Sequence, residues 1–361
     1  MNRKGIVAIL VVAAMLVTAV VVVVSTQPSH TSSKGTIIDA YDRQVNITST
    51  PKKIISVAPD ITELVYALGA GQDLVGVTDY CDYPHDVVSR VENGTLKSIG
   101  GFYTPSAERI VNMTPDLVFV SAGVSSHRAL VTQLEALDIK VIGLYDEVNI
   151  SRVYDNIKLM GKVLDKQAQA DQLVNDLSST LSKIDAKVSA QTVKLRVMYV
   201  VWLSPLSVVG NGTSLNEMIQ LAGGWTAFGN MQGWASPSLE TLLTNDPDVI
   251  LFSVMGGSQW DAEQLISDLS KDPIWNGTKA FQEGKVYMLK SQAANCFSRG
   301  GVRMTEAVQL LAEILYPQAF SAPSIPHSIG DEYRDYLTPL NALNTSALTV
   351  EVAGSVREVR G

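Results

Sequence analysis

Few side chains in this 361-residue sequence have the types and spacing of a catalytic or metal site. The sequence contains no His-Glu-x-x-His, Gly-x-Ser-x-Gly or phosphate-loop pattern, and Gly69-Ala70-Gly71 is typical of a helix end. Cys81 and Cys296 lack the neighbours that a zinc site needs. We therefore expect a binding protein, and this scarcity disfavours the rival interpretation, a metal-dependent or redox enzyme on a two-lobe scaffold. The histidines are isolated, at His30, His85, His127 and His327.

Aromatic side chains instead gather in segments that are expected to follow strands. In parallel α/β folds, ligands bind outside the carboxyl ends of strands, so such aromatic residues are candidates to enclose a ligand with a broad apolar face. The alternative is that each ring covers the core of its own lobe. The candidate ligand-binding residues are Tyr80, Tyr83, Phe102, Tyr103, Trp202, Trp234, Asn295, Phe297 and Arg299.

An internal repeat relates two distant parts of the chain. Residues 105–119 and 237–251 share Pro, Ser, Glu, Pro and Asp at corresponding positions. Each copy predicts a short helix, a Pro-Asp break and a buried strand. Glu108 and Glu240 occupy the same position at the start of these helices, where the helix dipole favours a carboxylate. That preference is one sufficient explanation, and the other is that two equivalent carboxylates dock a partner that carries matching cations.

The repeat indicates two α/β lobes, which we expect to be Rossmann-like, each with a parallel sheet, and a ligand cleft between them. The first lobe should comprise residues 36–150, with strands at 54–57, 74–77, 117–120 and 141–144. The second should comprise residues 191–315, with strands at 195–201, 249–252 and 286–289.

The connection between the lobes is predicted to be helical. Apolar residues within 151–190 recur at helical spacing, and residues 164–190 contain neither Gly nor Pro. We expect a single long rigid helix there, which would permit only a small opening of the lobes. Residues 316–361 are predicted to form an irregular tail with one short helix at 331–336.

Two further expectations concern single residues. Trp275 lies in a helix-like segment and is expected to be a core residue. Cys81 and Cys296 belong to loops of opposite lobes, so one hypothesis is a disulfide that locks the lobes together. The alternative is two unpaired small residues.

The N-terminus indicates an extracytoplasmic location. Arg3 and Lys4 precede an apolar run over residues 6–24 that is close to the length needed to span a bilayer. We expect residues 6–24 to anchor the chain in the cytoplasmic membrane, with residues 25–35 as a polar tether, while cleavage of this segment stays open.

The charge and the acceptor motifs add two expectations about the surface of the protein. The formal charge of −8 argues against a nucleic-acid partner, for which a basic face is expected. Glycosylation is one interpretation of the Asn-x-Ser/Thr acceptors, and the common occurrence of Asn-Gly-Thr turns is the other. The acceptors are Asn46, Asn93, Asn112, Asn149, Asn211, Asn276 and Asn344.

An ordered set of motifs resembles a known family. The set comprises residues 55–59, Thr62-Glu63, residues 76–84, both glutamate repeats and the joining helix. Together they resemble the class III periplasmic binding proteins of ABC importers over residues 36–315, and among these the chain is most similar to the cobalamin-binding proteins.

The resemblance implies a transported ligand and no cofactor of the protein's own. It implies that cobalamin or another corrinoid is held by Tyr80, Phe102, Trp202 and Trp234, whereas Asn295 replaces an Asp of the family. It also implies that Glu108 and Glu240 engage arginines of the permease, that a separate subunit hydrolyses ATP, and that the binding protein is a monomer.

Other ligands and roles stay open at this point. A ferric siderophore with anionic groups would pair with Arg299 or Arg303. Haem would need an axial ligand such as Tyr80, Tyr83 or His127. A surface adhesion or sensor module would use the same lobes without transport.

Overall fold

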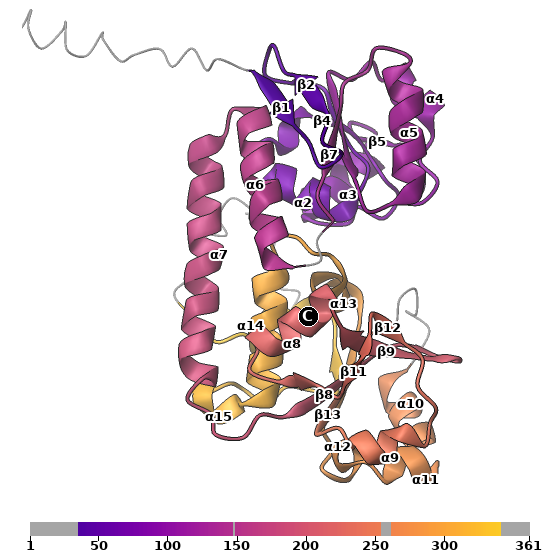
Figure 1. The fold of residues 1–361 in the computed structure, drawn as a ribbon, viewed down its shortest axis with the longest axis vertical. Helices are drawn as coiled ribbons and strands as arrows, with labels where there is room; N and C mark the ends of the chain where they lie inside the picture. Colours follow the sequence, from indigo (N-terminus) through magenta and orange to yellow (C-terminus); the bar gives the residue numbers. More distant parts are fainter. Residues whose placement is uncertain (1–34, 147–148, 254–260, 341–361) are drawn as a thin grey trace, which may run out of the picture. The chain divides into compact units, whose positions relative to one another are not determined.

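The computed structural model describes residues 35–146, 149–253 and 261–340 (Figure 1). The first lobe contains a five-stranded sheet in the order β5-β4-β3-β6-β7, with every neighbouring pair parallel, as predicted. A separate antiparallel pair, β1 with β2, precedes this sheet. The strands are β1 (Thr36–Ile38), β2 (Gln44–Asn46), β3 (Ile54–Ser56), β4 (Leu74–Val77), β5 (Lys97–Ser98), β6 (Leu117–Ser121) and β7 (Val141–Leu144).

The helices of the first lobe follow these strands and start with recognisable signals. Pro59 occupies the first turn of the helix after β3, where a missing N–H has no cost. Ser106 caps the first repeat helix by accepting a hydrogen bond from the backbone N–H of Arg109. The helices are α2 (Pro59–Ala67), the 3-10 turn η1 (Gly71–Asp73), α3 (His85–Glu92), α4 (Ala107–Asn112) and α5 (Ser125–Glu135).

The second lobe has a mixed sheet in the order β11-β9-β8-β13-β14-β15, with β10 beside β8 and β12 beside β9. Strands β8, β13, β14 and β15 run parallel to one another, as predicted for β8, β13 and β14. Strand β9 returns antiparallel to β8 through a turn at Ser204-Pro205, so the sheet of this lobe is mixed and not wholly parallel as predicted. The strands are β8 (Arg196–Leu203), β9 (Leu206–Asn211), β10 (Trp225–Thr226), β11 (Phe228–Gln232), β12 (Trp234–Ala235), β13 (Val249–Ser253), β14 (Val286–Leu289) and β15 (Ser328–Ile329).

The second repeat copy has the predicted order of elements. Helix α9 (Thr241–Asn245) is followed by the break and by β13, as α4 is followed by β6. Trp275 is 3% exposed and packs between Phe252 and Phe281, so its assignment to the core is confirmed. The remaining helices of this lobe are α8 (Ser214–Leu221), α10 (Ala262–Leu269), α11 (Pro273–Asn276), α12 (Lys279–Gln282), α13 (Ser291–Ser298) and α14 (Met304–Leu315).

The prediction of a single helix over residues 151–190 is wrong, because the region contains two. Helix α6 (Ile150–Leu164) ends where Asp165 adopts a left-handed conformation with φ of 61°, a conformation that Asp tolerates better than most residues. Helix α7 (Gln167–Val188) follows and packs along α6, and a Cβ on Gly161 would lie 2.4 Å from that of Ala170. The 22 residues of α7 span about 33 Å, and the helix also contacts α8, α14 and α15 of the second lobe.

Residues 316–340 belong to the second lobe and are not an irregular tail. Helix α15 (Pro317–Phe320) leads to β15, which pairs parallel with β14. The 3-10 helix η2 (Asp331–Tyr336) lies where a short helix was predicted. A two-residue strand is too short to leave a periodic signal in the sequence, which explains why β15 was missed.

One apolar core joins the parts of the molecule. It includes Ile54 and Leu64 of the first lobe, Met160 and Leu177 of the connecting helices, and Leu311 of the second lobe. The shared core is expected to resist separation of the lobes. The predicted anchor at residues 6–24 and the tail beyond residue 340 lie outside the described residues, within which the structure has no helix long and apolar enough to cross a membrane.

Candidate functional site

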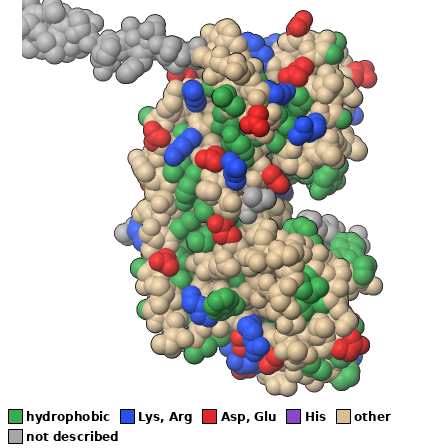
Figure 2. All heavy atoms as spheres, viewed as in Figure 1, with side chains coloured by type: hydrophobic (Ala, Val, Ile, Leu, Met, Phe, Trp, Pro, Cys, Tyr) green, Lys and Arg blue, Asp and Glu red, His purple; other side chains and the backbone are tan. Residues whose placement is uncertain are grey.

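The two lobes direct loops from the carboxyl ends of their strands toward a shared region. In the first lobe, α2 follows β3 and residues 78–84 follow β4. In the second, Trp202 lies near the end of β8 and α13 follows β14. Ligands of open α/β sheets bind at such edges. Figure 2 shows the surface hollowed between the first and second lobes.

Four of the predicted aromatic residues are exposed to an extent that is unusual for such large side chains. Tyr80 is 61% exposed, Tyr103 70%, Trp202 55% and Trp234 56%. Tyr80 and Tyr103 belong to loops after β4 and β5, whereas Trp202 belongs to β8 and Trp234 to β12. The Trp202 indole N–H donates to the carbonyl of Ser204 at 2.8 Å, so its polar edge is satisfied. Exposed apolar surface from both lobes is what a ligand with a broad apolar face requires.

Phe102 is half-buried beside Tyr103. Its ring centre lies 4.6 Å from that of Tyr103 and 5.1 Å from that of His127. Its carbonyl accepts a hydrogen bond from His127 Nε2 at 2.8 Å. This packing fixes the backbone that presents Tyr103.

Phe297 and His127 do not lie on the exposed aromatic surface. Phe297 is 2% exposed and its ring packs against Tyr199 in the core, because it faces inward from α13. His127 is fully buried, its Nδ1 accepts from the Ser121 N–H and its Nε2 bonds Phe102. Burial lowers the pKa of His127, so the ring is neutral and both nitrogens are engaged.

Tyr83 is also committed to internal contacts. Its hydroxyl accepts from Arg334 Nη2 at 2.8 Å, and its ring lies 4.3 Å from the Arg303 guanidinium and 5.1 Å from that of Arg334. Arg334 also pairs with Glu306 of α14. Tyr83 therefore contributes to the junction between lobes, and in this structure neither Tyr83 nor His127 offers a free axial ligand.

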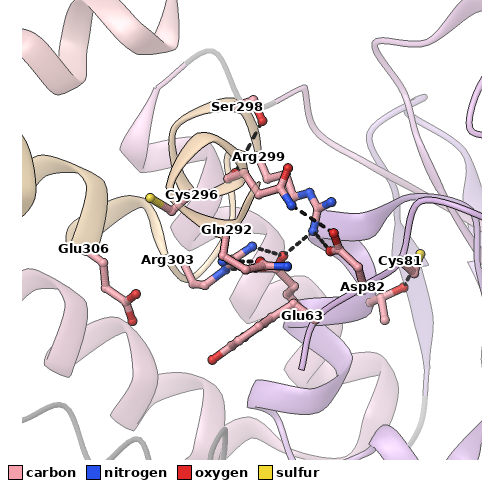
Figure 3. Close-up of polar contacts among 12 residues, drawn as sticks. Glu63, Cys81, Asp82, Gln292, Cys296, Ser298, Arg299, Arg303 and Glu306 are labelled. Atoms are coloured by element: carbon pink, nitrogen blue, oxygen red, sulfur yellow. Dashed lines mark hydrogen bonds and ion pairs between the residues drawn. The ribbon is translucent and has the colours of Figure 1, made fainter. Parts of the chain in front are cut away.

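A buried ion pair between Glu63 and Arg303 joins the two lobes (Figure 3). Glu63 of α2 accepts hydrogen bonds from Arg303 Nε at 2.8 Å and from Arg303 Nη2 at 2.7 Å, and each side chain is 1% exposed. Bidentate geometry of this kind gives the strongest carboxylate–guanidinium contacts. Burial opposes the charge on Arg303, but the attraction of Glu63 outweighs it and raises the Arg303 pKa well above its usual value.

Arg299 and Asn295 extend this junction outward to the loop after β4. Arg299 Nη1 donates to Glu63 at 3.1 Å and to Asp82 at 2.6 Å, and its Nη2 donates to the Tyr80 carbonyl at 3.1 Å. The Asn295 amide donates to the other Asp82 oxygen at 3.0 Å. Arg299 and Asn295 were expected to contact a ligand directly, but both bond to residues of the first lobe.

Sequence reasoning missed this junction, which we call the lobe junction and define as Glu63, Asp82, Asn295, Arg299 and Arg303. The sequence offered two signals for it. Glu63 lies in a helix of mostly apolar residues, and two arginines lie four residues apart at positions 299 and 303. Nothing in the local pattern says that these charges, 236 residues or more apart, pair with one another.

Both cysteines are free and buried thiols. Cys81 Sγ lies 3.2 Å from the hydroxyls of Thr62 and Thr78, and Cys296 Sγ donates to the Ala293 carbonyl. Burial raises the pKa of Cys81 to about 11 and that of Cys296 to about 12. The structure therefore favours two unpaired residues over the hypothesis of a disulfide lock.

The two repeat glutamates are exposed at equivalent helix starts. Glu108 lies in the first turn of α4, and Glu240 is the N-cap of α9. A hydrogen bond from Ser238 lowers the pKa of Glu240, so this carboxylate is ionised at neutral pH. Within the described residues, no group of three or more His, Cys, Asp or Glu side chains has the arrangement of a metal site.

Both α/β lobes carry exposed aromatic side chains, and a buried ion pair joins the lobes, which is an arrangement compatible with a solute-binding protein. The chain belongs to the periplasmic binding protein family, because that family's sequence model matches residues 54–293. It is therefore a non-enzymatic, extracytoplasmic substrate-binding component of an ABC importer, with a permease partner and a small-molecule ligand.

Individual relatives are distant. The chain is 29% identical to the uncharacterized ABC transporter substrate-binding lipoprotein YvrC of Bacillus subtilis, over 79% of this chain and 86% of that protein. It is 26% identical to the vitamin B12-binding protein of Vibrio cholerae, over 62% of this chain and 80% of that protein. A crystal structure of a possible iron-binding periplasmic solute-binding protein of Staphylococcus epidermidis matches with a TM-score of 0.65 and 25% identity, covering 74% of this chain and 100% of that one.

Proposed function

We propose that the protein captures cobalamin or another corrinoid and delivers it to an ABC importer. The observation that carries the proposal is the set of four exposed aromatic side chains, Tyr80, Tyr103, Trp202 and Trp234, contributed by both lobes. A corrin ring offers a large apolar face, and burial of such surface is the main favourable term in binding it. The similarity to a protein named for vitamin B12 binding supports the same ligand class.

The chemistry of the junction favours a corrinoid over a ferric siderophore with anionic groups. A ferric siderophore with anionic groups would need an available cation, yet Arg299 and Arg303 are paired with Glu63 and Asp82. Haem would need an axial ligand, and Tyr80 is the exposed candidate among the three considered. A ferric chelate is the second candidate because the S. epidermidis relative is described as iron-binding.

Isothermal titration of the full-length protein with cyanocobalamin, a ferric hydroxamate and haemin tests this proposal. A 1:1 stoichiometry with cyanocobalamin and no heat from the other two would support it. No heat from cyanocobalamin together with a signal from the ferric hydroxamate or from haemin would refute the corrinoid assignment and keep the family assignment.

Delivery would use the two repeat glutamates. We propose that Glu108 and Glu240 bind cations on the two halves of the permease, because both are exposed and hold equivalent positions in the two lobes. The double variant Glu108→Arg/Glu240→Arg should abolish uptake by cells while ligand affinity measured by titration stays unchanged. Unchanged uptake would refute the docking role and would favour a sensor or adhesion module.

The location of the protein gives two further proposals. We propose that residues 6–24 anchor a monomer in the cytoplasmic membrane. We also propose N-glycosylation, because the acceptors Asn46, Asn93, Asn112, Asn211 and Asn276 are exposed. Mass spectrometry of the native protein with and without glycosidase treatment checks glycosylation, and partition into detergent checks the anchor.

A further inference from the structure

Asp82 differs from the rest of the lobe junction in its exposure. The side chains of Glu63 and Arg303 are 1% exposed and that of Arg299 is 12% exposed, whereas the Asp82 side chain is 43% exposed. Asp82 also lies two residues from Tyr80, whose ring is exposed and whose carbonyl accepts from Arg299. The junction therefore presents one accessible carboxylate directly beside an aromatic residue of the proposed ligand surface.

Both oxygens of this carboxylate are held from the second lobe. Oδ1 accepts from Arg299 at 2.6 Å (Figure 3). Oδ2 accepts from Asn295 at 3.0 Å. A carboxylate has about four acceptor positions, so these two contacts leave acceptor capacity on each oxygen. Because the orientation of the group is already fixed, a ligand donor that binds it loses less conformational entropy.

The cation of the pair is less accessible than the carboxylate: three of the five N–H donors of Arg299 have partners in the first lobe, and its side chain is 12% exposed against 43% for Asp82. Arg299 donates to Glu63, to Asp82 and to the Tyr80 carbonyl, and it is largely buried. The polar chemistry that this part of the junction offers outward is therefore that of an acceptor. A ligand carboxylate placed there would meet a like charge, whereas an amide N–H or a hydroxyl would meet a charge-assisted acceptor.

We infer that Asp82 is a direct ligand contact that selects for neutral ligands bearing amide or hydroxyl donors. This inference rests on the proposed binding function, and it narrows the ligand to molecules that combine a broad apolar face with amide side chains. Arg299 and Asn295 act as positioning residues because they orient the carboxylate.

A comparison of two ligands on two variants tests this inference. Titration uses the full-length protein with cyanocobalamin and with a cyanocobalamin monocarboxylate, in which one side-chain amide is replaced by a carboxylate. Asp82→Asn should weaken cyanocobalamin binding by about 10- to 100-fold, the range expected for loss of a charge-assisted hydrogen bond. The wild type should bind the monocarboxylate more weakly than cyanocobalamin, and Asp82→Asn should narrow that difference.

Two control variants separate ligand contact from structural effects. Asp79→Asn removes the same charge from an exposed residue of the same loop that bonds Ser98 of its own lobe, and should change affinity by less than about 2-fold. Asn295→Ala removes one inter-lobe hydrogen bond but keeps the carboxylate, so its effect should be smaller than that of Asp82→Asn. Equal loss in both junction variants, or wild-type affinity in Asp82→Asn, would overturn the inference while leaving the proposed function intact. No binding of cyanocobalamin by the wild type would overturn both.

Discussion

The buried pair of Glu63 and Arg303 should be a major contributor to the stability of the protein. Substitution Glu63→Gln removes a carboxylate that accepts three hydrogen bonds from two arginines, at 2.7, 2.8 and 3.1 Å. Arg299 keeps Asp82 as a counter-charge, but Arg303 keeps only the neutral Gln292 and the Tyr83 ring among the contacts described here. Loss of one partner from a buried pair costs about 3–5 kcal/mol, and the remaining contacts of Arg303 favour the lower part of that range, about 3 kcal/mol.

The measurement is urea unfolding followed by tryptophan fluorescence and by circular dichroism. Because the core is shared between the lobes, we expect the two signals to report one transition, with a lower midpoint in the variant and an unchanged slope. A double variant, Glu63→Leu/Arg303→Met, should recover much of the loss because it leaves no buried charge at either position.

An exposed pair provides the matched control. Lys271 and Asp268 lie 2.6 Å apart but are 69% and 54% exposed, so Asp268→Asn should leave the midpoint unchanged. If Glu63→Gln lowered the urea midpoint as little as Asp268→Asn, the pair of Glu63 and Arg303 would not be a desolvated contact, and burial would not set its contribution to stability.

Three further predictions concern single residues. A ligand that covers the exposed 56% of Trp234 would bury roughly 140 Å² of it, worth about 3.5 kcal/mol, so Trp234→Ala should weaken cyanocobalamin binding by up to roughly 400-fold in titration. Trp225 is 58% exposed but pairs with Arg196 at the opposite end of β8, so Trp225→Ala should leave affinity unchanged, and equal losses would contradict the proposed surface. Burial raises the pKa of Cys81 to about 11 and that of Cys296 to about 12. Neither thiol should therefore react with iodoacetamide at pH 8 until urea unfolds the protein. Rapid alkylation of the folded protein, seen by mass spectrometry, would contradict the buried positions of the two thiols. Burial lowers the pKa of His127 in the folded state, so the unfolded chain binds a proton at His127 more readily than the folded protein does. The free energy of unfolding should therefore fall as the pH drops below about 6.5, the ordinary pKa of histidine. His127→Gln should make this pH dependence shallower, and an identical dependence in the variant would exclude His127 as its source.

The sequence was most informative where the signal was local. Short runs of buried aliphatic residues identified β3, β4, β6, β7, β8, β13 and β14, because both faces of such strands are covered. The repeat identified a helix start in each lobe, with Ser106 as the N-cap and Glu108 in the first turn of α4, and with Glu240 as the N-cap of α9. Of the aromatic residues that the sequence singled out, Tyr80 and Tyr103 lie in loops after strands and Trp202 and Trp234 lie in strands, and all four are exposed, whereas their contact with a ligand stays a prediction.

Local patterns failed where a choice between burial and exposure depends on the neighbours of an element. Asn295 and Phe297 lie two residues apart on α13, yet one bonds Asp82 and the other lies against Tyr199 in the core. The left-handed Asp165 divides the predicted helix, because one non-glycine residue in that conformation leaves no trace in hydrophobic spacing. Strand β15 forms only because β14 provides an edge for it.

By itself, the sequence determined the class of fold, the two related lobes and the family, because periodicity, turn residues and ordered motifs are properties of short segments. Only the tertiary structure decided that Glu63 meets Arg303, that Asp82 is held by Arg299 and Asn295, and that His127 has no free nitrogen. The physical reason is that a charge or a ring acquires its role from desolvation and from its partner. For Glu63, both arise when α2 packs against a part of the chain more than two hundred residues away, whereas the partners of His127 lie within 25 residues but on other elements of its own lobe.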